Sequence, residues 1–194
     1  MRLGEFYHAF FLTIWAAWAV TWLVFSHNVK ANIRRQAALP RILNVALLFC
    51  TFALLWAQQL PAPGLMERFL PGSQWPFWTT LGAGLTLIGL LFTVWARIFL
   101  GRNWSGVVTI KADHELVTGG PYGLVRHPIY SGLALAIVGT ALAIGEWRGV
   151  LAVALAFIAF FQRILVEERF MRQQFGAAYD EYALRVRAFL PGVI

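Results

Sequence analysis

The sequence is poor in charged residues and has almost no cysteine. Only 13% of its 194 residues are charged, 59% are hydrophobic, and the mean hydropathy is +0.65. Soluble domains typically carry about 25% charged residues, so a soluble globule with an ordinary surface is excluded. The single cysteine, Cys50, leaves neither a disulfide framework nor a thiolate metal site. We therefore predict an integral membrane protein.

Signatures of two ligand classes are also missing. The formal charge of +7 is gathered into a few loops, and no basic stripe with interleaved aromatic residues is present, so we expect no nucleic acid partner. The four histidines lack the paired spacing of metal ligands. We therefore expect no metal site.

Apolar runs long enough, or nearly long enough, to cross a bilayer recur along the chain. The fourth is short and is followed by the polar turn 145–149, which predicts a helical hairpin formed by the last two runs. The first run has no cleavage signal and is interpreted as a retained helix. The sequence thus predicts an all-α membrane bundle of about five transmembrane helices. The runs are Tyr7–Phe25, Ile42–Leu60, Trp78–Leu100, Tyr130–Ile144 and Val150–Val166.

Basic residues flank these runs mainly on one side. The other side holds only Arg2, Arg68 and Arg148. The positive-inside rule then places the N-terminus outside, the C-terminus in the cytoplasm and the polar segments described below at the cytoplasmic face. The basic residues on the predicted cytoplasmic side are Lys30, Arg34, Arg35, Arg41, Arg97, Arg102, Lys111, Arg126, Arg163, Arg169, Arg172, Arg185 and Arg187.

Neither an internal repeat nor a long linker divides the chain, so residues 1–194 are predicted to form one membrane domain. Residues 1–100 supply three N-terminal spans, and residues 101–194 carry the candidate functional segments. Small residues permit close helix packing in the third run. They are Gly82, Gly84 and Gly89. We interpret the tryptophans as an interfacial belt and assign them no chemistry.

The segment 114–130 concentrates polar and helix-breaking residues beside the membrane, where such groups are costly. Pro128 suits a first helical position, so His127 should cap the fourth helix, with Tyr130 in the same first turn. A helix N-terminus favours an anionic group. Upstream, 119–121 lets the backbone approach a ligand, and Tyr122 can stack on a flat ring. An ordinary interfacial loop remains the alternative.

A second polar cluster ends the last apolar run. Arg163 and Glu167 are four residues apart and share a helix face, which favours a functional pair, although a purely structural pair remains open. Glu168 faces elsewhere and could simply pair with Arg172. Residues 175–186 then indicate an amphipathic cytoplasmic helix, which could lie on headgroups or close over the site.

Taken in order, these motifs resemble one family. They are His114-x-Leu-Val-Thr-x-Gly-Pro-Tyr122, Arg126-His-Pro-x-Tyr-x-Gly132, Glu167-Glu168 and Phe175-Gly-x-x-Tyr179-x-x-Tyr182, followed by Val186 and Pro191. The ordered set resembles the isoprenylcysteine carboxyl methyltransferases and, more loosely, the membrane phospholipid methyltransferases. The likeness covers roughly residues 102–191.

The resemblance implies an S-adenosylmethionine-dependent methyltransferase that releases S-adenosylhomocysteine and binds its cofactor at the cytosolic face. In agreement, no strand followed by GxGxxG occurs. The resemblance assigns Arg163 and Glu167 to the methyl acceptor. It assigns to the cofactor His114, Leu116, Val117, Gly119, Pro121, Tyr122, His127, Tyr130 and, as a closing residue, Glu168.

The acceptor implied is the carboxylate of a lipid-like or isoprenylcysteine-type molecule that enters from the bilayer lipids. An ionised carboxylate needs a cation to hold it, for which Arg163 is suited. Phospholipid or amine N-methylation, with Glu167 as base, is the alternative. A non-enzymatic membrane protein or transporter subunit is the rival from another class. Against transport, no charged residue lies in mid-span.

Overall fold

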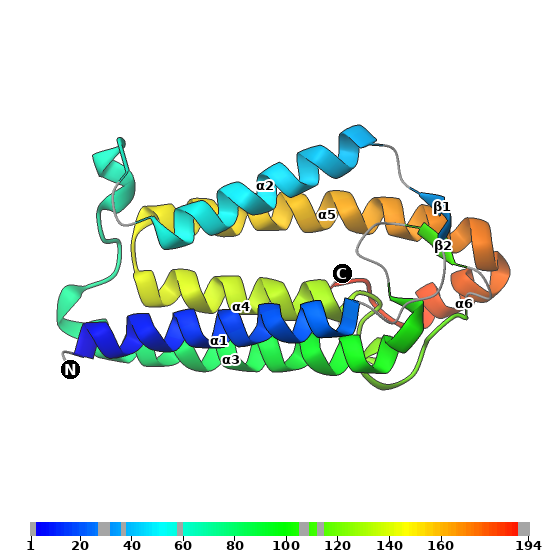
Figure 1. Ribbon diagram of the computed structural model, residues 1–194, viewed down its shortest axis with the longest axis horizontal. Coiled ribbons are helices and arrows are strands. Elements are labelled where there is room, and N and C mark those ends of the chain that lie inside the picture. Colours follow the sequence, from blue (N-terminus) through cyan, green and yellow to red (C-terminus); the bar gives the residue numbers. More distant parts are fainter. Residues whose placement is uncertain are drawn as a thin grey trace.

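The computed structural model describes residues 3–26, 32–35, 38–57, 60–104, 109–111 and 115–189. Its long helices run lengthwise through one bundle (Figure 1). Four of those in the described residues are long and apolar enough to cross a membrane, while α4, with 17 residues, is shorter. The prediction of a helical membrane bundle is confirmed. The long helices are α1 (Leu3–Ser26), α2 (Ala38–Trp56), α3 (Trp75–Leu100), α4 (Pro128–Ile144) and α5 (Trp147–Phe175).

Shorter elements connect the long helices. Strand β1 (Asn32–Arg35) pairs antiparallel with β2 (Thr109–Lys111) near the end of the bundle where α6 (Ala177–Arg185) lies (Figure 1). The all-α prediction missed this ribbon, because strands this short lack the alternation that identifies a strand in sequence. The single-turn helices are η1 (Pro63–Met66), η2 (Gly72–Gln74), η3 (Gly101–Asn103) and η4 (Gly120–Gly123).

The predicted hairpin of the last two apolar runs is present. Helix α4 ends at Gly145, whose φ of +67° is the left-handed conformation that glycine tolerates best, and its N–H bonds to the Ala141 carbonyl at 2.9 Å. Helix α5 starts two residues later and continues to Phe175, well beyond the predicted end at Val166. The amphipathic sequence after Val166 extends the helix past the apolar run, which hydropathy alone does not register.

Helices α3 and α4 pack at glycines. A Cβ atom added to Gly82 would lie 2.3 Å from the Gly139 carbonyl oxygen, and one added to Gly89 would lie 2.5 Å from that of Gly132. Gly84 has nothing within 4 Å of a Cβ position. Two of the three glycines singled out in the sequence therefore allow the helices to touch, and the third does not.

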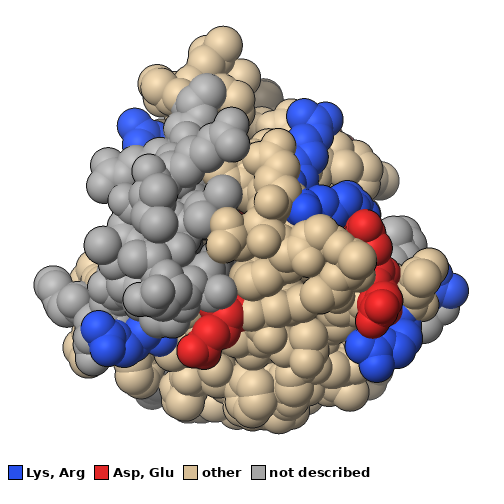
Figure 2. Space-filling view, turned by 90° about the vertical axis from the view of Figure 1, so that its right-hand side faces the viewer, with Lys and Arg blue, Asp and Glu red and all other residues tan. Residues whose placement is uncertain are grey.

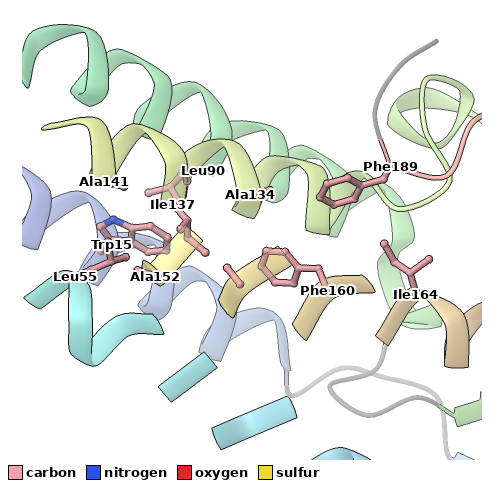
Figure 3. Close-up of a cluster of buried hydrophobic side chains, with 12 residues drawn as sticks. Trp15, Leu55, Leu90, Ala134, Ile137, Ala141, Ala152, Phe160, Ile164 and Phe189 are labelled. Carbon is pink, nitrogen blue, oxygen red and sulfur yellow. The ribbon is translucent and has the colours of Figure 1, made fainter. Parts of the chain in front are cut away.

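The hydrophobic core joins all the long helices (Figure 3). The cluster includes Trp15 of α1, Leu55 of α2, Ile137 of α4 and Phe160 of α5, and Phe189 reaches it from the segment after α6. Trp15 also donates a 3.1 Å hydrogen bond from Nε1 to the Thr140 hydroxyl. Because Phe189 is anchored in this core, the segment after α6 is held against the start of α4.

Candidate functional site

The two polar segments of the sequence meet at one end of the bundle. His127 is the N-cap of α4, as predicted, and Pro128 follows at the first helical position. Glu167 and Glu168 face His127 from α5. Figure 2 looks at this end of the molecule and shows acidic side chains beside basic ones.

Tyr130, Arg163 and Glu167 form one hydrogen-bonded cluster. The Tyr130 hydroxyl accepts a 2.6 Å hydrogen bond from Arg163 Nε and donates one to Glu167 Oε1. Arg163 Nε also lies 3.2 Å from the same carboxylate oxygen. The predicted shared face of Arg163 and Glu167 is confirmed, and Tyr130 joins the pair to α4.

His127 lies between two carboxylates. Its Nδ1 is 3.5 Å from Glu167 Oε2, and its Nε2 is 3.5 Å from Glu168 Oε1. Burial lowers the pKa of His127, but hydrogen bonding and attraction to the two carboxylates outweigh burial, so this pKa is raised above its ordinary value. Its ring also stacks on Tyr130, with centroids 5.9 Å apart.

Glu168 connects this cluster to the C-terminal segment. Its Oε1 accepts hydrogen bonds from Arg126 at 2.5 and 3.1 Å, and its Oε2 accepts one from Arg172 at 3.2 Å. Arg126 in turn donates to the carbonyls of Ala183 at 3.0 Å and Val186 at 2.5 Å. The predicted Glu168–Arg172 pair thus exists, but a second arginine makes Glu168 part of a clasp that holds the chain after α6.

Two tyrosines of α6 share its buried face, as the amphipathic pattern predicts. The Tyr182 hydroxyl donates a 2.6 Å hydrogen bond to the Tyr122 carbonyl. Burial raises the pKa of Tyr182 to about 12 and also raises the pKa values of Tyr179 and Tyr122. All three phenols therefore stay protonated at neutral pH, and Tyr182 uses its proton in the bond to Tyr122.

These groups surround a cavity of about 540 Å³. Seven residues predicted for the site line it, whereas Gly119, Pro121 and Glu168 do not line it. Tyr179 and Tyr182 of α6 also lie in its wall, so α6 closes over the site. His114 lies outside the described residues. The seven lining residues are Leu116, Val117, Tyr122, His127, Tyr130, Arg163 and Glu167.

The residues outside the cavity wall support it. Pro121 is fully buried, and Glu168 contacts the far side of His127. A Cβ atom added to Gly120, whose φ is +56°, would lie 2.5 Å from the Phe99 ring, and one added to Gly119 would lie 3.3 Å from it. The glycines of this segment therefore allow close packing on α3.

Sequence analysis missed the opposite wall of the cavity. Trp18 and Trp22 of α1 line it together with Trp104, which follows η3. The Trp18 and Trp22 rings stack with centroids 4.9 Å apart, and Trp22 meets Trp104 edge-on at 5.5 Å. The three- and four-residue spacing of Trp15, Trp18 and Trp22 was the available signal, because it places all three on one helix face.

The cavity also contains buried polar atoms that lack a partner. Asn103 Oδ1, His127 Nε2 and the Tyr179 hydroxyl make no hydrogen bond within the described part of the chain, and all three residues line the cavity. Unpaired buried polar atoms are rare and costly in folded proteins. Their presence in this wall fits the binding of a polar ligand.

Comparison with known proteins gives the family. Residues 77–178 match the family model described as phospholipid methyltransferase. The chain belongs to this family. The matched region includes α3, α4, α5 and the start of α6, and it therefore covers both polar clusters.

Individual relatives confirm the resemblance seen in the motifs. The chain is 35% identical to protein-S-isoprenylcysteine O-methyltransferase B of Arabidopsis thaliana over 129 residues, which cover 64% of this chain and 66% of the relative. It is 32% identical to the nickel-cobalt-cadmium resistance protein NccN of Alcaligenes xylosoxydans xylosoxydans over 120 residues, which cover 61% of this chain and 55% of that protein. The chain thus spans two thirds or less of each of these relatives.

A solved structure shows the same fold. The eukaryotic intramembrane Ras methyltransferase ICMT, an isoprenylcysteine carboxyl methyltransferase, superimposes with a TM-score of 0.58 at 22% identity. The match covers 83% of this chain and 55% of that one. Together with the apolar helices, this fold supports an integral membrane protein.

Proposed function

We propose that this chain is an S-adenosylmethionine-dependent integral membrane methyltransferase. The observation that carries the proposal is the cluster of His127, Tyr130, Arg163 and Glu167 in the wall of a 540 Å³ cavity, within the region that matches the family model. Ligand pockets of about 300 to 1,000 Å³ bury drug-sized molecules, so the volume suits a cofactor of this size. The name of the Arabidopsis relative supports methyl transfer.

The cofactor half of the cavity is formed by the segment before α4 and by α6. We assign it Leu116, Val117, Tyr122, His127 and Tyr130 in the wall, with Gly119, Pro121 and Glu168 supporting it and His114 completing the set. Bound S-adenosylmethionine would supply a methyl group on a sulfonium. The phenolic hydroxyl of Tyr179 can donate to its polar groups, and the surrounding aromatic rings exclude water.

The acceptor half contains Arg163 and Glu167. We favour the carboxylate of a lipid-like thioether, because an ionised carboxylate needs no base but does need a cation to hold it. Arg163 supplies that cation, and Tyr130 with Glu167 fixes its orientation. Trp18, Trp22 and Leu48 give this cavity an apolar wall on the side of α1 and α2, which suits a lipophilic chain. The name of the Arabidopsis relative supports this acceptor.

Methylation of an amine headgroup is the second candidate. The family description names phospholipids, and Glu167 lies in the cavity wall, where a carboxylate could remove a proton from an amine. An ammonium group beside Arg163 would be repelled, which is why we place this candidate second.

We also propose that residues 1–194 act as one membrane domain with five membrane segments, the N-terminus outside and the C-terminus in the cytoplasm. The basic residues that follow α1, α3 and α5 support this orientation. The site would then open to the cytoplasm for the cofactor and to the bilayer lipids for the acceptor.

Binding and product analysis test the proposal. Purified protein should bind S-adenosylhomocysteine in calorimetry and should transfer labelled methyl from S-adenosylmethionine to S-prenylated N-acetylcysteine as a base-labile ester. The same probe with its carboxyl converted to an amide is the control and should stay unlabelled. A base-stable methylamine in phosphatidylethanolamine vesicles would select the second candidate. Absence of S-adenosylhomocysteine binding would contradict the proposed function.

A further inference from the structure

A second cavity lies at the end of the bundle opposite α6. Its volume is about 240 Å³, and its wall comes from the first parts of α1, α3 and α5 and the last parts of α2 and α4 (Figure 1). The proposed methyl transfer does not use it, because Tyr130 and Arg163 line the larger cavity, which α6 closes. Drug-sized ligands need about 300 to 1,000 Å³, so this smaller cavity suits a compact polar group.

Arg68 lines this cavity from a fixed backbone. The Phe69 N–H donates to the Gly145 carbonyl at 3.0 Å, and the Trp147 N–H donates to the Glu67 carbonyl at 3.1 Å. Both chain neighbours of Arg68 are thereby bonded to the turn between α4 and α5. The guanidinium of Arg68 nevertheless makes no hydrogen bond or ion pair within the described part of the chain. The fold thus holds a cation at the cavity wall and leaves it available to a ligand.

Arg148 adds a second guanidinium to this wall. Its Nε binds Glu146 at 2.6 Å and its Nη1 donates to carbonyls at the end of α2, whereas Nη2 makes no hydrogen bond to any described residue. Only 9% of Arg148 is exposed, and unpaired polar groups in so buried a residue are costly. The N–H groups of Nη2 therefore remain for a ligand in the cavity.

We propose that this cavity binds the phosphate of an anionic phospholipid headgroup, at the membrane face opposite the proposed active site. Its wall contains two arginines and one carboxylate, that of Glu146, whose charge Arg148 already offsets. Glu5 and Glu67 are exposed and lie outside the wall. The remaining charge is positive, so an anion is attracted and a cationic group is repelled. Guanidinium groups match phosphate oxygens with paired hydrogen bonds.

The surroundings of the cavity favour a lipid over a free anion. Trp56 and Trp75 line it, and Phe77 and Trp147 are exposed at the same end of the bundle. Aromatic side chains at the ends of membrane spans lie at the level of the headgroups. Basic pockets between membrane helices are a known mode of binding for anionic headgroups. A lipid bound here would contact all five long helices and should therefore stabilise the bundle.

Arg68→Gln is the decisive variant, because replacing Arg148 would also remove contacts that hold the fold. The midpoint of thermal unfolding in detergent micelles is measured as short-chain phosphatidylglycerol is added. In the native chain this lipid should raise the midpoint at concentrations at which phosphatidylcholine of the same chain length does not. Arg68→Gln should need about tenfold more lipid for the same rise, the scale of one charge-assisted contact. Arg68→Lys should lie between the two, because it keeps the charge but loses the fork.

Arg41→Gln is the matched control, since Arg41 is an exposed arginine at the start of α2, at the other end of the bundle. Its lipid requirement should stay within about twofold of that of the native chain. All three variants should unfold at the native midpoint in lipid-free detergent, so that damage to the fold is distinguished from loss of binding. Equal effects of Arg41→Gln and Arg68→Gln would overturn the proposal, because diffuse surface charge would then explain them.

Glycerol phosphate separates a headgroup from a free anion. It carries the phosphate without acyl chains and should raise the midpoint far less than phosphatidylglycerol at the same concentration. If it stabilises the native chain as strongly as the lipid does, the lipid assignment is wrong. None of these measurements depends on methyl transfer, so the headgroup site and the proposed function are tested separately.

Discussion

Helix α5 has a buried arginine–glutamate pair towards each end, and the two differ in what surrounds them. At its start, Arg148 binds Glu146 through Nε at 2.6 Å and donates from Nη1 to the carbonyls of Leu54, Leu55 and Ala57. Further along, Arg163 binds Glu167 and the Tyr130 hydroxyl and faces the large cavity. Both arginines are mostly buried, with side-chain exposures of 11% and 20%.

The difference separates structural charges from functional ones. The carbonyls that Arg148 binds belong to the end of α2, where a helix leaves its last carbonyls without internal partners. Arg148 therefore closes a helix end with backbone acceptors. Arg163 binds the side chains of Tyr130 and Glu167, which a ligand can rearrange. Both pairs line a cavity, of about 240 Å³ at Arg148 and about 540 Å³ at Arg163. What distinguishes them is therefore the partner of the arginine, which is backbone carbonyls for Arg148 and a tyrosine and a glutamate side chain for Arg163.

Replacing Arg148 gives the largest expected effect on stability. Arg148→Met should lower the free energy of unfolding by about 3 to 5 kcal/mol, because it leaves the Glu146 carboxylate and three carbonyls unpaired. Denaturation in detergent micelles measures the loss. Arg68→Gln, an exposed arginine at the same end, is the control and should change stability by less than about 0.5 kcal/mol. A loss below 1 kcal/mol in Arg148→Met would show that Arg148 does not stabilise the fold in the way the comparison requires.

Replacing Arg163 tests the functional half. Arg163→Lys keeps the charge but loses the planar fork that fits a carboxylate, so methyl transfer should fall about 100-fold. S-adenosylhomocysteine affinity and the midpoint of thermal unfolding should stay close to native values. Arg172→Lys is the control on the same helix and should retain activity. If Arg163→Lys transferred methyl within threefold of the native rate, Arg163 would belong with Arg148 as a structural residue.

Most of the fold could be predicted from sequence because hydropathy records burial in lipid directly. The hairpin of α4 and α5 followed from Gly145 and the polar turn after it, and the N-cap position of His127 followed from Pro128. The β1–β2 ribbon and the extension of α5 to Phe175 did not, because neither produces an apolar run. Which glycines touch a partner helix also required the structure, since Gly84 and Gly82 look alike in sequence.

The charged half of the site was predictable, and the apolar half was not. Spacing on α5 placed Arg163 and Glu167 on one face, as the structure confirms. The resemblance placed His127 in the cofactor pocket, but sequence could not show that both of its nitrogens face carboxylates from α5. Trp18, Trp22 and Leu48 reach the cavity only through packing of α1 and α2 beside the later helices. Such contacts between distant segments leave no local pattern.

Replacing Arg172, a third arginine of α5, has the smallest expected effect on stability. It compares an exposed arginine with the two buried ones. It binds Glu168 at 3.2 Å and Asp180 at 3.3 Å, but its side chain is 48% exposed and that of Asp180 is 61% exposed. Glu168 also keeps Arg126 as a nearer partner at 2.5 Å. Exposed pairs contribute about 0 to 1 kcal/mol and weaken with salt, so Arg172→Ala should lower stability by at most about 0.5 kcal/mol. Unfolding at low and high ionic strength measures this loss of stability. Asp180→Asn is the matched variant, because it removes the charge of the partner of Arg172. A loss above 2 kcal/mol in Arg172→Ala alone would show that Arg172 holds α6 over the cavity together with Arg126, and exposure would then no longer distinguish the surface arginine from the two buried ones.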